Sequence, residues 1–443
     1  MAESKFETIV IGGGSAGLAF ATTAGRIGGR VLLVERAQLG GTCVNRGCVP
    51  KKILWAAGNL ANSVKDAAAQ KIMQANPVDF ETLVKERDSH IAGIRASYVD
   101  TLKDAGVRTE SGQAVIVDAK TVEVGQKTFK ADQIVLATGG RPAVLEIEGS
   151  EFLQDSDDVL SWARRPDRIV IVGGGYIGCE FAAIFAALGS TVSLIHDGPH
   201  ILDAYPKDLA LHVQERLRNT GIDLYLNYGV RTVRKEADRT CCTLQSGETK
   251  MADAIVAATG RVPNIDDLGV LVAQLDTADS GALKVTKEFE TSCPGIYAIG
   301  DVADRLPLTP VASADGTVLA HKLHGNGASA IDLDLVATTT FVYPPAAHVG
   351  TVGHAPAREG CVTPLEKNVM ASNPAASDFY QICADESSNA LIGAAIAARG
   401  AEDIIAMAGA LIAAKAKVDA FTAATPVHPS FAEEFFSDTR KDD

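Results

Sequence analysis

Residues 8–17 read TIVIGGGSAG and residues 169–178 read IVIVGGGYIG, so the same pattern returns 161 positions later. In each copy a short apolar run, typical of a buried strand, meets a glycine cluster and then small or apolar residues typical of a helix. The first glycine permits a tight turn, the second lets backbone N–H groups approach a pyrophosphate, and the third lets the helix pack on its strand. One copy alone fits a ligand-free turn equally well, but two in register predict two dinucleotide-binding units.

Both copies continue to a second apolar strand, and there they differ. Residues 31–34 end at Glu35, 18 positions after Gly17, where a carboxylate can accept hydrogen bonds from adenosine ribose hydroxyls. Residues 192–195 end instead at His196, which Asp197 follows. Later, ATGGRP (137–142) and ATGRVP (258–263) each close an apolar strand and indicate the ends of two nucleotide domains. The turn glycines are Gly12, Gly14 and Gly17 in the first copy and Gly173, Gly175 and Gly178 in the second.

The composition is that of an ordinary globular protein, since 47% of the 443 residues are hydrophobic and 22% are charged. The length predicts about two to four domains. The net charge of −14 repels phosphate backbones and anionic lipid, which argues against nucleic acid and membrane partners. No apolar run reaches the roughly 18 residues of a bilayer span, and residues 1–7 lack the basic region of a secretory signal. We therefore expect a soluble cytoplasmic protein.

Two cysteines lie in GGTCVNRGCVPKK, residues 40–52. In a regular helix the Cα atoms of Cys43 and Cys48 would be about 8.6 Å apart, whereas a disulfide needs less than about 7 Å. A Cys43–Cys48 bond therefore requires a distorted turn, which Gly47 and Pro50 make plausible. Buried free thiols, half of a zinc site, or a coincidence of composition are the alternatives, although no further ligands accompany the pair at zinc-finger spacing. In a reducing compartment a deliberate disulfide would be redox-active.

Six motifs follow one another in the order of a known family. They are GGGSAG (12–17), GGTCVNRGCVPKK (40–52), GGGYIGCE (173–180), ATGRVPN (258–264), IYAIGDV (296–302) and HPSFAEE (428–434). With these motifs the chain resembles the flavin-dependent disulfide reductases, the class I pyridine nucleotide-disulfide oxidoreductases, along essentially its whole length. It is most similar to the glutathione reductase branch and also similar to lipoamide dehydrogenase. Mercuric reductase fits less well because the second cysteine pair expected near its C-terminus is absent.

The resemblance implies an α/β fold with two Rossmann-like nucleotide-binding domains and a C-terminal α+β dimerisation domain. We expect an FAD-binding domain with the redox disulfide at 1–145 and an NAD(P)H-binding domain at 146–263. A central segment that returns to FAD would occupy 264–333, and the dimerisation domain 334–443. In the last domain we expect a strand at 338–342 and an Ala-rich helix at 401–416 whose apolar stripe packs in the core.

The resemblance also implies the catalytic roles. Electrons would pass from NAD(P)H through FAD to the Cys43–Cys48 disulfide, with Cys48 beside the flavin and Cys43 attacking a small-molecule disulfide. His428, oriented by Glu433, would reach the cysteines of the other subunit, so that a homodimer shares each active site. An ion pair of Lys51 and Glu180 would lie near the flavin N5.

The matching positions give the expected binding residues. Tyr176 would be the lid that covers the flavin before nicotinamide enters, and Tyr98 and Arg46 would contact substrate. The FAD residues would be Gly12, Gly14, Ser15, Ala16, Gly17, Glu35, Gly41, Thr42, Ala114, Thr138, Gly139 and Asp301. The NAD(P)H residues would be Gly173, Gly175, Tyr176, Ile177, Gly178, Glu180, His196, Asp197 and Gly260. We predict no metal, and we read Cys179, Cys241, Cys242, Cys293, Cys361 and Cys383 as structural.

The sequence departs from the branch at the coenzyme site. Reductases that use NADPH carry arginines just after the second strand of that domain, whereas this chain has Asp197 and Asp203 there. Carboxylates repel a 2′-phosphate and can bind ribose hydroxyls. Gly178 also stands where those enzymes commonly have alanine. We therefore expect NADH to be favoured over NADPH.

The substrate side departs from the branch as well. Thr317 and Thr22 stand where glutathione-binding arginines are expected, which predicts a less anionic or differently shaped disulfide. Arg46, in the cysteine loop, either supplies some of that charge or is an exposed loop residue. Two rival functions stay open: a dihydrolipoamide dehydrogenase, and a non-catalytic flavoprotein that senses NADH or scaffolds a partner. The retained cysteines, His428 and Glu433 argue against the second.

Overall fold

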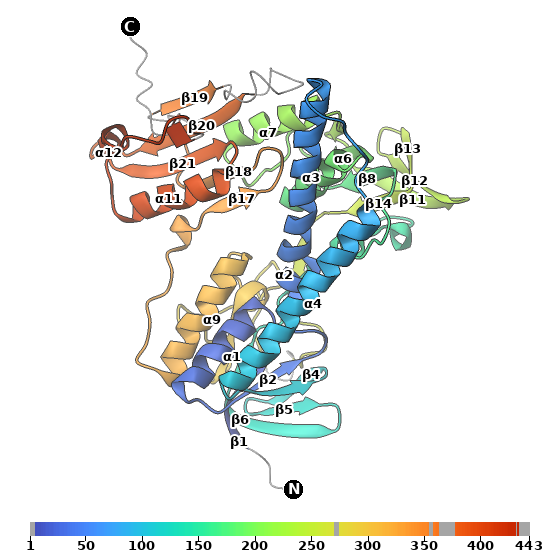
Figure 1. Ribbon diagram of the computed structural model, residues 1–443. Helices are drawn as coiled ribbons and strands as arrows, with labels where there is room; N and C mark the ends of the chain where they lie inside the picture. The colour runs from blue at the N-terminus through green and yellow to red at the C-terminus, as the bar shows by residue number, and fades with distance from the viewer. Residues whose placement is uncertain (1–4, 270–273, 354–357, 363–376, 431, 434–443) are drawn as a thin grey trace. The chain divides into compact units, whose positions relative to one another are not determined.

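The computed structural model of the chain describes residues 5–269, 274–353, 358–362, 377–430 and 432–433 (Figure 1). The side chains of residues 358–362 and 421–422 are not described. The chain divides into two compact units. Unit 1 comprises residues 1–51, 84–143 and 260–333, and unit 2 comprises residues 52–83, 144–259 and 334–443.

Unit 1 is built on a seven-stranded sheet in the order β3-β2-β1-β6-β5-β4, with β16 also paired to β6. Strands β1, β2, β3, β6 and β16 run parallel, whereas β4 and β5 are antiparallel to their neighbours. The strands are β1 (Lys5–Ile11), β2 (Val31–Glu35), β3 (Arg108–Ser111), β4 (Ala114–Asp118), β5 (Thr121–Val124), β6 (Lys127–Leu136) and β16 (Ile296–Ala298). A separate ribbon pairs β7 (Gly140–Pro142) with β15 (Arg261–Pro263).

Two helices of unit 1 pack on each other across a long sequence separation. α1 (Ser15–Ile27) and α9 (Thr309–His324) lie side by side (Figure 1). A Cβ added at Gly316 would lie 2.3 Å from the carbonyl oxygen of Ala16, so a glycine is needed for this approach. The remaining helices that begin in or belong to this unit are α2 (Gly41–Arg46), α3 (Cys48–Ala69), whose residues from 52 on belong to unit 2, α4 (Phe80–Asp104), which belongs to unit 1 from residue 84, and the short η2 (Gly300–Val302).

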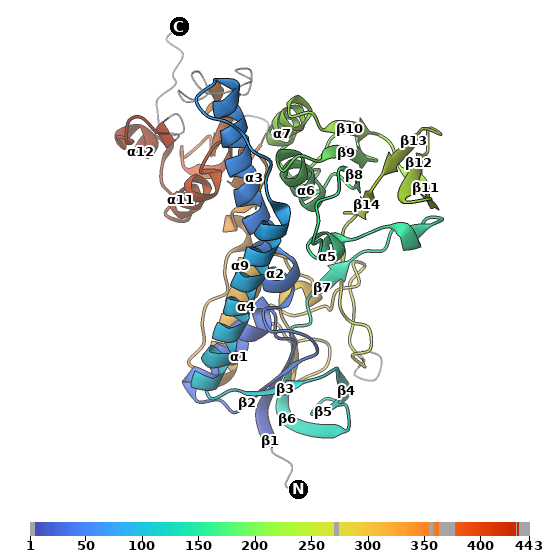
Figure 2. The same ribbon diagram turned by 45° about the vertical axis from the view of Figure 1, so that its right-hand side comes forward.

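The first part of unit 2 is a second parallel sheet, in the order β10-β9-β8-β14. α6 lies beside it (Figure 2), and the three-stranded antiparallel sheet β11-β12-β13 lies between β10 and β14 in the sequence. The elements are η1 (Ser150–Phe152), α5 (Ser156–Val159), β8 (Arg168–Val172), α6 (Tyr176–Ala187), β9 (Thr191–His196), α7 (Lys207–Asn219), β10 (Asp223–Leu226), β11 (Val230–Glu236), β12 (Arg239–Leu244), β13 (Thr249–Ala252) and β14 (Ala254–Ala257). Strands β8 and β14 are almost wholly buried and rich in Val and Ile, as parallel strands covered on both faces are.

The second part of unit 2 is a five-stranded antiparallel sheet, β17-β18-β21-β20-β19, with α11 packed on it. Its elements are η3 (Leu333–Leu335), β17 (Thr338–Thr340), β18 (Ala346–Gly350), β19 (Arg358–Val362), β20 (Asp378–Ala384), β21 (Leu391–Ala397), α11 (Ala401–Ala413) and α12 (Val418–Ala423). The apolar stripe of α11 is buried at Ile404, Ile405 and Ala408, so it packs in the core as predicted.

Two predicted elements are shorter than expected. The strand at 338–342 ends at Thr340, because the next backbone N–H, that of Phe341, bonds to a side chain of α6 rather than to a strand. The helix expected to reach Ala416 ends at Ala413, since Lys415 has a φ of +53° and the carbonyl of Ala416 accepts the N–H of Leu391 instead.

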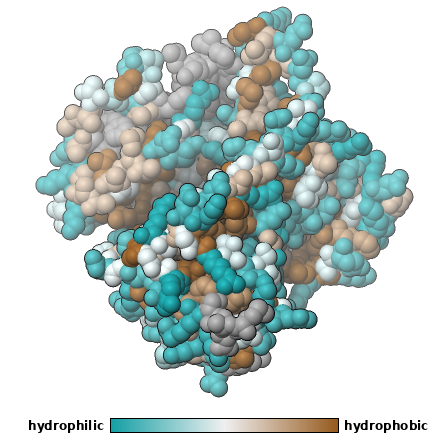
Figure 3. Space-filling model, turned by 60° about the horizontal axis from the view of Figure 1, so that its bottom comes forward, coloured by the Kyte–Doolittle hydropathy of each residue, from teal (hydrophilic) through white to brown (hydrophobic). Residues whose placement is uncertain are grey.

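Hydrophilic side chains cover much of the face in Figure 3, where hydrophobic residues form scattered patches. Within the described part of the chain, none of the helices has the length and apolar character that crossing a bilayer requires.

Candidate active site

The glycine turn of unit 1 is fixed by close backbone contacts. Gly12 has a φ of +109°, and a Cβ there would lie 2.3 Å from the carbonyl oxygen of Ala137. A Cβ on Gly17 would lie 1.9 Å from the carbonyl oxygen of Gly12, so both positions exclude larger residues. At Gly14 the nearest atom to an added Cβ is 3.7 Å away. The outer glycines therefore serve the turn itself, and the middle one leaves space at the start of α1.

Glu35 reaches back to this turn from the end of β2. Its Oε2 accepts the N–H of Gly13 at 2.6 Å, and its Oε1 accepts the N–H of Ala37 at 2.7 Å. A carboxylate has about four acceptor positions. Glu35 is therefore held in place with acceptor capacity left for the hydroxyls of a ribose.

The turn of unit 2 repeats this geometry. Gly173 has a φ of +114°, and its Cβ would lie 2.3 Å from the carbonyl oxygen of Ala258. A Cβ on Gly178 would lie 2.0 Å from the carbonyl oxygen of Gly173, while one on Gly175 would meet nothing within 4 Å. The predicted repeat is thus present in the backbone, with open space again at the middle glycine.

His196 takes the place that Glu35 has in unit 1. Its Nδ1 lies 3.2 Å from the N–H of Gly174 and its Nε2 lies 3.0 Å from Oδ2 of Asp203. Because the backbone N–H can only donate, Nδ1 accepts and Nε2 carries the proton that is donated to Asp203. Asp197 is exposed beside this ring, with its Oδ1 at 3.4 Å from Nδ1. The position therefore presents an imidazole ring with two carboxylates beside it.

The cysteine loop, residues 40–52, has the distortion that a bond between Cys43 and Cys48 would need. α2 ends at Arg46 and α3 begins at Cys48, and Gly47 between them has φ −151° and ψ −119°, far from helical values. The side chains of Cys43 and Cys48 are hydrogen-bonded to each other as thiols. Cys48 is exposed and Cys43 is partly buried.

The environment of Cys43 disfavours the ionised form of its thiol. The hydrogen bond with Cys48, and then burial, raise the pKa of the Cys43 thiol far above its ordinary value. The charge of an ionised Cys48 adds to this effect. Cys48 lies at the first position of a 22-residue helix, where the helix dipole favours negative charge.

Two hydroxyls and a phenol surround the cysteines. Thr309 Oγ1 lies 3.5 Å from Sγ of Cys48, and hydrogen bonds from Thr309 and Ser15 act to lower the pKa of Cys43. Burial, and then the charge of Cys43, raise the pKa of Tyr98. Unit 1 thus brings Cys43, Cys48, Ser15 and Tyr98 together. Arg46 is exposed at the end of α2.

Sequence reasoning missed two residues of this site. Thr309 begins α9, 261 positions after Cys48, and the Thr-Pro pair at a helix start was the available signal. Asn45, between the cysteines, donates through Nδ2 to the carbonyls of Leu39 at 3.1 Å and Gly41 at 2.9 Å. It ties α2 to the loop before it.

Asp301 lies in η2 of unit 1, at the end of β16. Burial raises the pKa of its carboxyl, and the charge of Arg261 opposes this. Thr138 and Asn264 join the two neighbouring loops, since Thr138 Oγ1 donates to the carbonyl of Asn264 at 2.6 Å and Asn264 Nδ2 donates to that of Thr138 at 3.1 Å. Thr138 follows the carboxyl end of the parallel strand β6, and Asp301 that of β16, where dinucleotides bind in such sheets.

The other predicted FAD residues lie on the same elements or in the core. Ala16 is buried in α1, and Thr42 lies in α2. Gly41 has a φ of +56°, and its Cβ would lie 2.6 Å from Cα of Gly14. Ala114 begins β4 and is only 3% exposed. Gly139 has a φ of +69°, and no atom would lie within 4 Å of its Cβ.

In unit 2, His428 and Glu433 form a pair near the C-terminus. His428 Nδ1 lies 2.7 Å from Oε1 and 2.9 Å from Oε2 of Glu433. The ring is 77% exposed, so Nε2 is open to a second group. The two residues belong to a different unit from the cysteines.

The remaining unit 2 residues lie on α6. Tyr176 begins the helix and is 42% exposed, and Ile177 follows it. Glu180 is 3% exposed, and its Oε1 accepts the N–H of Phe341 at 2.8 Å. Lys51, its expected partner, belongs to unit 1, as does Gly260.

Of the five other cysteines whose side chains are described, four are buried on helices or strands. Cys179 and Cys242 are completely buried, and Cys241 and Cys383 nearly so. Cys293 is partly buried. The side chain of Cys361, on β19, lies outside the described residues.

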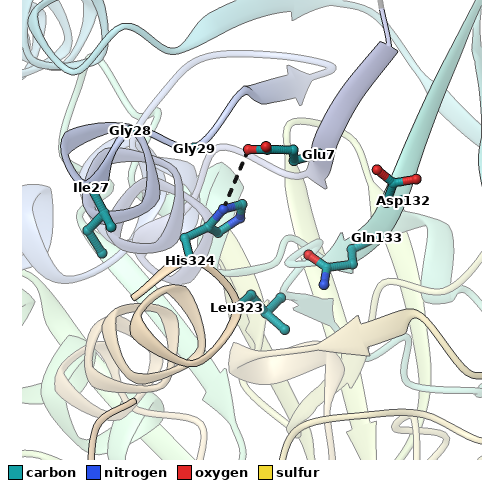
Figure 4. A pocket seen from close by; sticks show the side chains of 8 residues that line it. All are labelled: Glu7, Ile27, Gly28, Gly29, Asp132, Gln133, Leu323 and His324. Carbon is teal, nitrogen blue, oxygen red and sulfur yellow. Dashed lines mark ion pairs between the residues drawn. The ribbon is translucent and has the colours of Figure 1, made fainter. Parts of the chain in front are cut away.

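A pocket of about 410 Å³ lies elsewhere in unit 1 (Figure 4). It is lined by Glu7, Ile27, Gly28, Gly29, Asp132, Gln133, Leu323 and His324. Glu7 precedes the middle of β1, and Gly28 and Gly29 precede β2, so the pocket is at the amino-terminal edge of the parallel strands. The glycine turn is at their carboxyl ends, so this pocket is not the dinucleotide site.

Comparison with known proteins identifies the family. The family model described as pyridine nucleotide-disulphide oxidoreductase matches residues 6–316, and the model of that family's dimerisation domain matches residues 336–438. The chain belongs to the pyridine nucleotide-disulphide oxidoreductases. The predicted family and fold class are confirmed, and the chain is an NAD(P)H-dependent disulfide oxidoreductase with a dimerisation domain that indicates a homodimer.

Similar proteins include two curated enzyme types. The glutathione reductase of Burkholderia cepacia is 35% identical over 98% of this chain and 98% of its own. The dihydrolipoyl dehydrogenase of Geobacillus stearothermophilus is 30% identical over 96% of this chain and 94% of its own. A solved Cu(II) complex of the HOCl-induced flavoprotein disulfide reductase RclA from Escherichia coli has the same fold, with a TM-score of 0.87 at 24% identity over 97% of this chain and 98% of that one.

The residues of unit 1 fit the FAD that the family implies. The space at Gly14 lets a pyrophosphate approach the start of α1, and Glu35 is fixed with acceptor positions to spare. Asp301 is a partly buried carboxyl to which ligand hydroxyls could donate. In unit 2 the space at Gly175 gives the same approach for a nicotinamide dinucleotide.

Proposed function

We propose that this enzyme reduces a low-molecular-weight disulfide with electrons from NADH in preference to NADPH. The observation that carries the proposal is the hydrogen-bonded pair Cys43 and Cys48 at a helix break, next to a dinucleotide turn that fits FAD. When bound, FAD supplies the exchange between a hydride from reduced nicotinamide and an electron pair for a disulfide.

The two sulfurs then have different tasks. Reduction of the Cys43–Cys48 disulfide by two electrons leaves one thiolate, held by Cys48 at the start of α3, and one thiol at Cys43. The raised pKa of Cys43 means that a base must take its proton before it can attack. His428 of the partner subunit is the base we propose, with Glu433 stabilising its charged form.

The sulfur exchange balances as follows. The Cys43 thiolate attacks one sulfur of the substrate, a mixed disulfide forms, and the other substrate sulfur leaves with the proton from His428. The Cys48 thiolate then attacks Cys43, which restores the Cys43–Cys48 disulfide. The second substrate sulfur leaves as a thiolate and takes a proton from water.

We propose that Lys51 and Glu180 form an ion pair that tunes hydride transfer. Tyr176, exposed at the start of α6, is proposed to cover the nicotinamide site until the coenzyme binds. The other predicted residues at the two turns are proposed as backbone contacts to the two dinucleotides.

The NADH preference rests on His196 and the carboxylates beside it. Asp203 is bonded to Nε2 of His196, and Asp197 is exposed next to the same ring. A 2′-phosphate placed here would face two carboxylates, whereas a ribose hydroxyl can donate to them. The charge at this position therefore favours the coenzyme without the phosphate.

The substrate is proposed to carry less negative charge than oxidised glutathione. Thr317 donates its hydroxyl to the carbonyl of Ser313, one turn earlier on α9, and so offers no cation to a carboxylate. Thr22 lies on α1. Arg46 and Tyr98 are the side chains of the redox region that we propose contact the substrate.

The alternative is a dihydrolipoamide dehydrogenase, which the similarity to the Geobacillus stearothermophilus enzyme favours. For either function we infer a reducing compartment such as the cytoplasm, since the buried cysteines outside the redox loop are free thiols.

A matrix of NADH and NADPH oxidation against oxidised glutathione, lipoamide, cystine and glutathione-derived disulfides tests the proposal. We expect turnover with at least one disulfide and a higher kcat/KM for NADH. A higher kcat/KM for NADPH would contradict the coenzyme assignment. Absence of turnover with every disulfide would contradict the function and favour a non-catalytic flavoprotein.

A further inference from the structure

Residues 340–343, which follow β17, make an unusual series of contacts within unit 2. Thr340 Oγ1 donates to the hydroxyl of Tyr205 at 2.5 Å, and the N–H of Phe341 donates to Glu180 at 2.8 Å. The carbonyl of Val342 accepts Nε1–H of Trp55 at 3.0 Å, and the hydroxyl of Tyr343 donates to the carbonyl of Trp55 at 2.8 Å. Each of the four residues is thus bonded to α3, to α6 or to Tyr205.

Lys52 fixes the aromatic part of this segment. Its Nζ lies 3.7 Å from the ring centroid of Phe341 and 3.9 Å from that of Trp55, so the cation touches both rings. The two rings meet edge to face with centroids 5.5 Å apart. Glu402, in the first turn of α11, receives the same Nζ at 3.1 Å. A cation held between two rings and one carboxylate has little freedom to move.

Glu180 accepts a hydrogen bond from this segment. It is 3% exposed on α6, and its bond to the Phe341 N–H comes from the segment that follows β17. A buried carboxylate is turned by the donors around it. Displacement of Phe341 would therefore rotate or shift the Glu180 carboxylate.

We propose that Lys52 is a positioning residue for Glu180, acting through Phe341 and Trp55. This inference rests on the proposed role of Glu180 in hydride transfer. Lys52 follows Lys51 in α3 and is four positions after Cys48. The first turns of this helix therefore carry both the cysteine and the lysine that contacts Phe341 and Trp55. The predicted consequence is selective: the step that NADH drives depends on Lys52, and the step that consumes the disulfide does not.

Stopped-flow measurements on the holoenzyme separate the two steps. The flavin absorbance is followed first as NADH reduces the oxidised enzyme, and then as disulfide reoxidises the reduced enzyme. Lys52→Met removes the charge and keeps the length of the side chain. We expect reduction by NADH to slow about tenfold, since small displacements of a positioned group have effects of this size or larger, and reoxidation to stay within about twofold of wild type.

Three further variants test whether the slower reduction is specific to the Lys52 cation and to Glu180. Lys52→Arg keeps a cation over the rings and should restore the reduction rate. Lys85→Met removes an exposed lysine of α4 and should change neither rate. In a Glu180→Gln background, Lys52→Met should cause no further slowing, because the residue through which it acts is already altered.

Urea unfolding of the holoenzyme gives a readout other than activity. A double-mutant cycle of Lys52→Met and Phe341→Leu should be non-additive, since each change removes the same cation–ring contact. An additive cycle would contradict the contact between Lys52 and Phe341 on which the positioning role depends.

The outcomes distinguish this inference from the proposed function. A Lys52→Met enzyme that is reduced at the wild-type rate, or is slowed equally in both steps, overturns the positioning role and leaves the function intact. A wild-type enzyme whose flavin neither NADH nor NADPH reduces would instead contradict the proposed function.

Discussion

The two glycine turns share a backbone and differ in the side chain that closes them. At Gly12 and Gly173 an added Cβ would lie 2.3 Å from a carbonyl oxygen in both cases. The N–H of the next glycine is then bonded to Glu35 in unit 1 and to His196 in unit 2. Close packing therefore fixes the turn in both copies, and the side chain at the end of the second strand, which differs between them, is the one that we propose selects the ligand.

The largest effect is expected at the turns themselves. Gly12→Ala and Gly173→Ala each place a Cβ against a carbonyl oxygen at a positive φ, at a cost of about 3 kcal/mol or more. Gly12→Ala should lose FAD, and Gly173→Ala should keep FAD and lose affinity for NADH. FAD per chain after purification and the KM for NADH measure this.

Gly28→Ala is the matched control for both changes. Its φ is +103°, but no atom would lie within 4 Å of the new Cβ, so it adds strain without a clash. Loss of FAD from the Gly173→Ala enzyme with retention in Gly12→Ala would mean that the two turns have been assigned in reverse.

The next effect is expected where the turns differ. Replacing both Asp197 and Asp203 with arginine removes two carboxylates and offers charged hydrogen bonds to a 2′-phosphate, each worth about 1.5–3 kcal/mol. The ratio of kcat/KM for NADPH to that for NADH should rise by at least about tenfold. Asp223→Arg, an exposed change of the same charge at the start of β10, should leave the ratio unaltered. An unchanged ratio in the double variant would show that this loop does not select the coenzyme.

A smaller effect, on the free energy of unfolding in acid, should distinguish unit 2 from unit 1. In unit 2, burial lowers the pKa of His348 from 6.5 to about 4. The unfolded chain binds a proton at His348 more readily than the folded chain. Protonation therefore costs no stability above about pH 6.5, and the free energy of unfolding decreases as the pH falls towards 4. Unfolding free energy should be about 1 kcal/mol lower at pH 5.5 than at pH 7 on this account.

His348→Gln should remove that part of the pH dependence, as urea unfolding at the two pH values would reveal. In unit 1, burial also lowers the pKa of His324, but Glu7 opposes it. His324→Gln serves as the comparison. An equal loss of stability at pH 5.5 in wild type and His348→Gln would contradict the assignment.

The smallest effect is expected in the cysteine loop, residues 40–52, which the second glycine-turn unit lacks. Arg46→Gln removes an exposed charge, and such contacts are worth about 1 kcal/mol or less. The KM for an anionic disulfide should rise about two- to fivefold and that for the neutral amide of lipoic acid should not change. A rise of the same size for both would place Arg46 in the fold of the loop rather than in substrate binding.

Much of this comparison was predictable from local sequence. The turns follow from glycine spacing, and the break between α2 and α3 follows from the distance that a Cys43–Cys48 bond requires. The contacts of Thr309 with the cysteines and of Phe341 with Glu180 join residues 261 and 161 positions apart. Local pattern carries no information on such pairs. The early end of the strand at Thr340 has the same origin, because a distant side chain takes its next hydrogen bond.

The central claim is that reducing equivalents pass through the sulfurs of Cys43 and Cys48. The most direct test is to count alkylated cysteines by mass spectrometry in holoenzyme treated with a thiol reagent before and after one equivalent of NADH under anaerobic conditions. We predict that Cys43 and Cys48 are protected in the oxidised enzyme and that both become alkylated after NADH. Disulfide turnover with no change in the alkylation of these two residues would contradict the account.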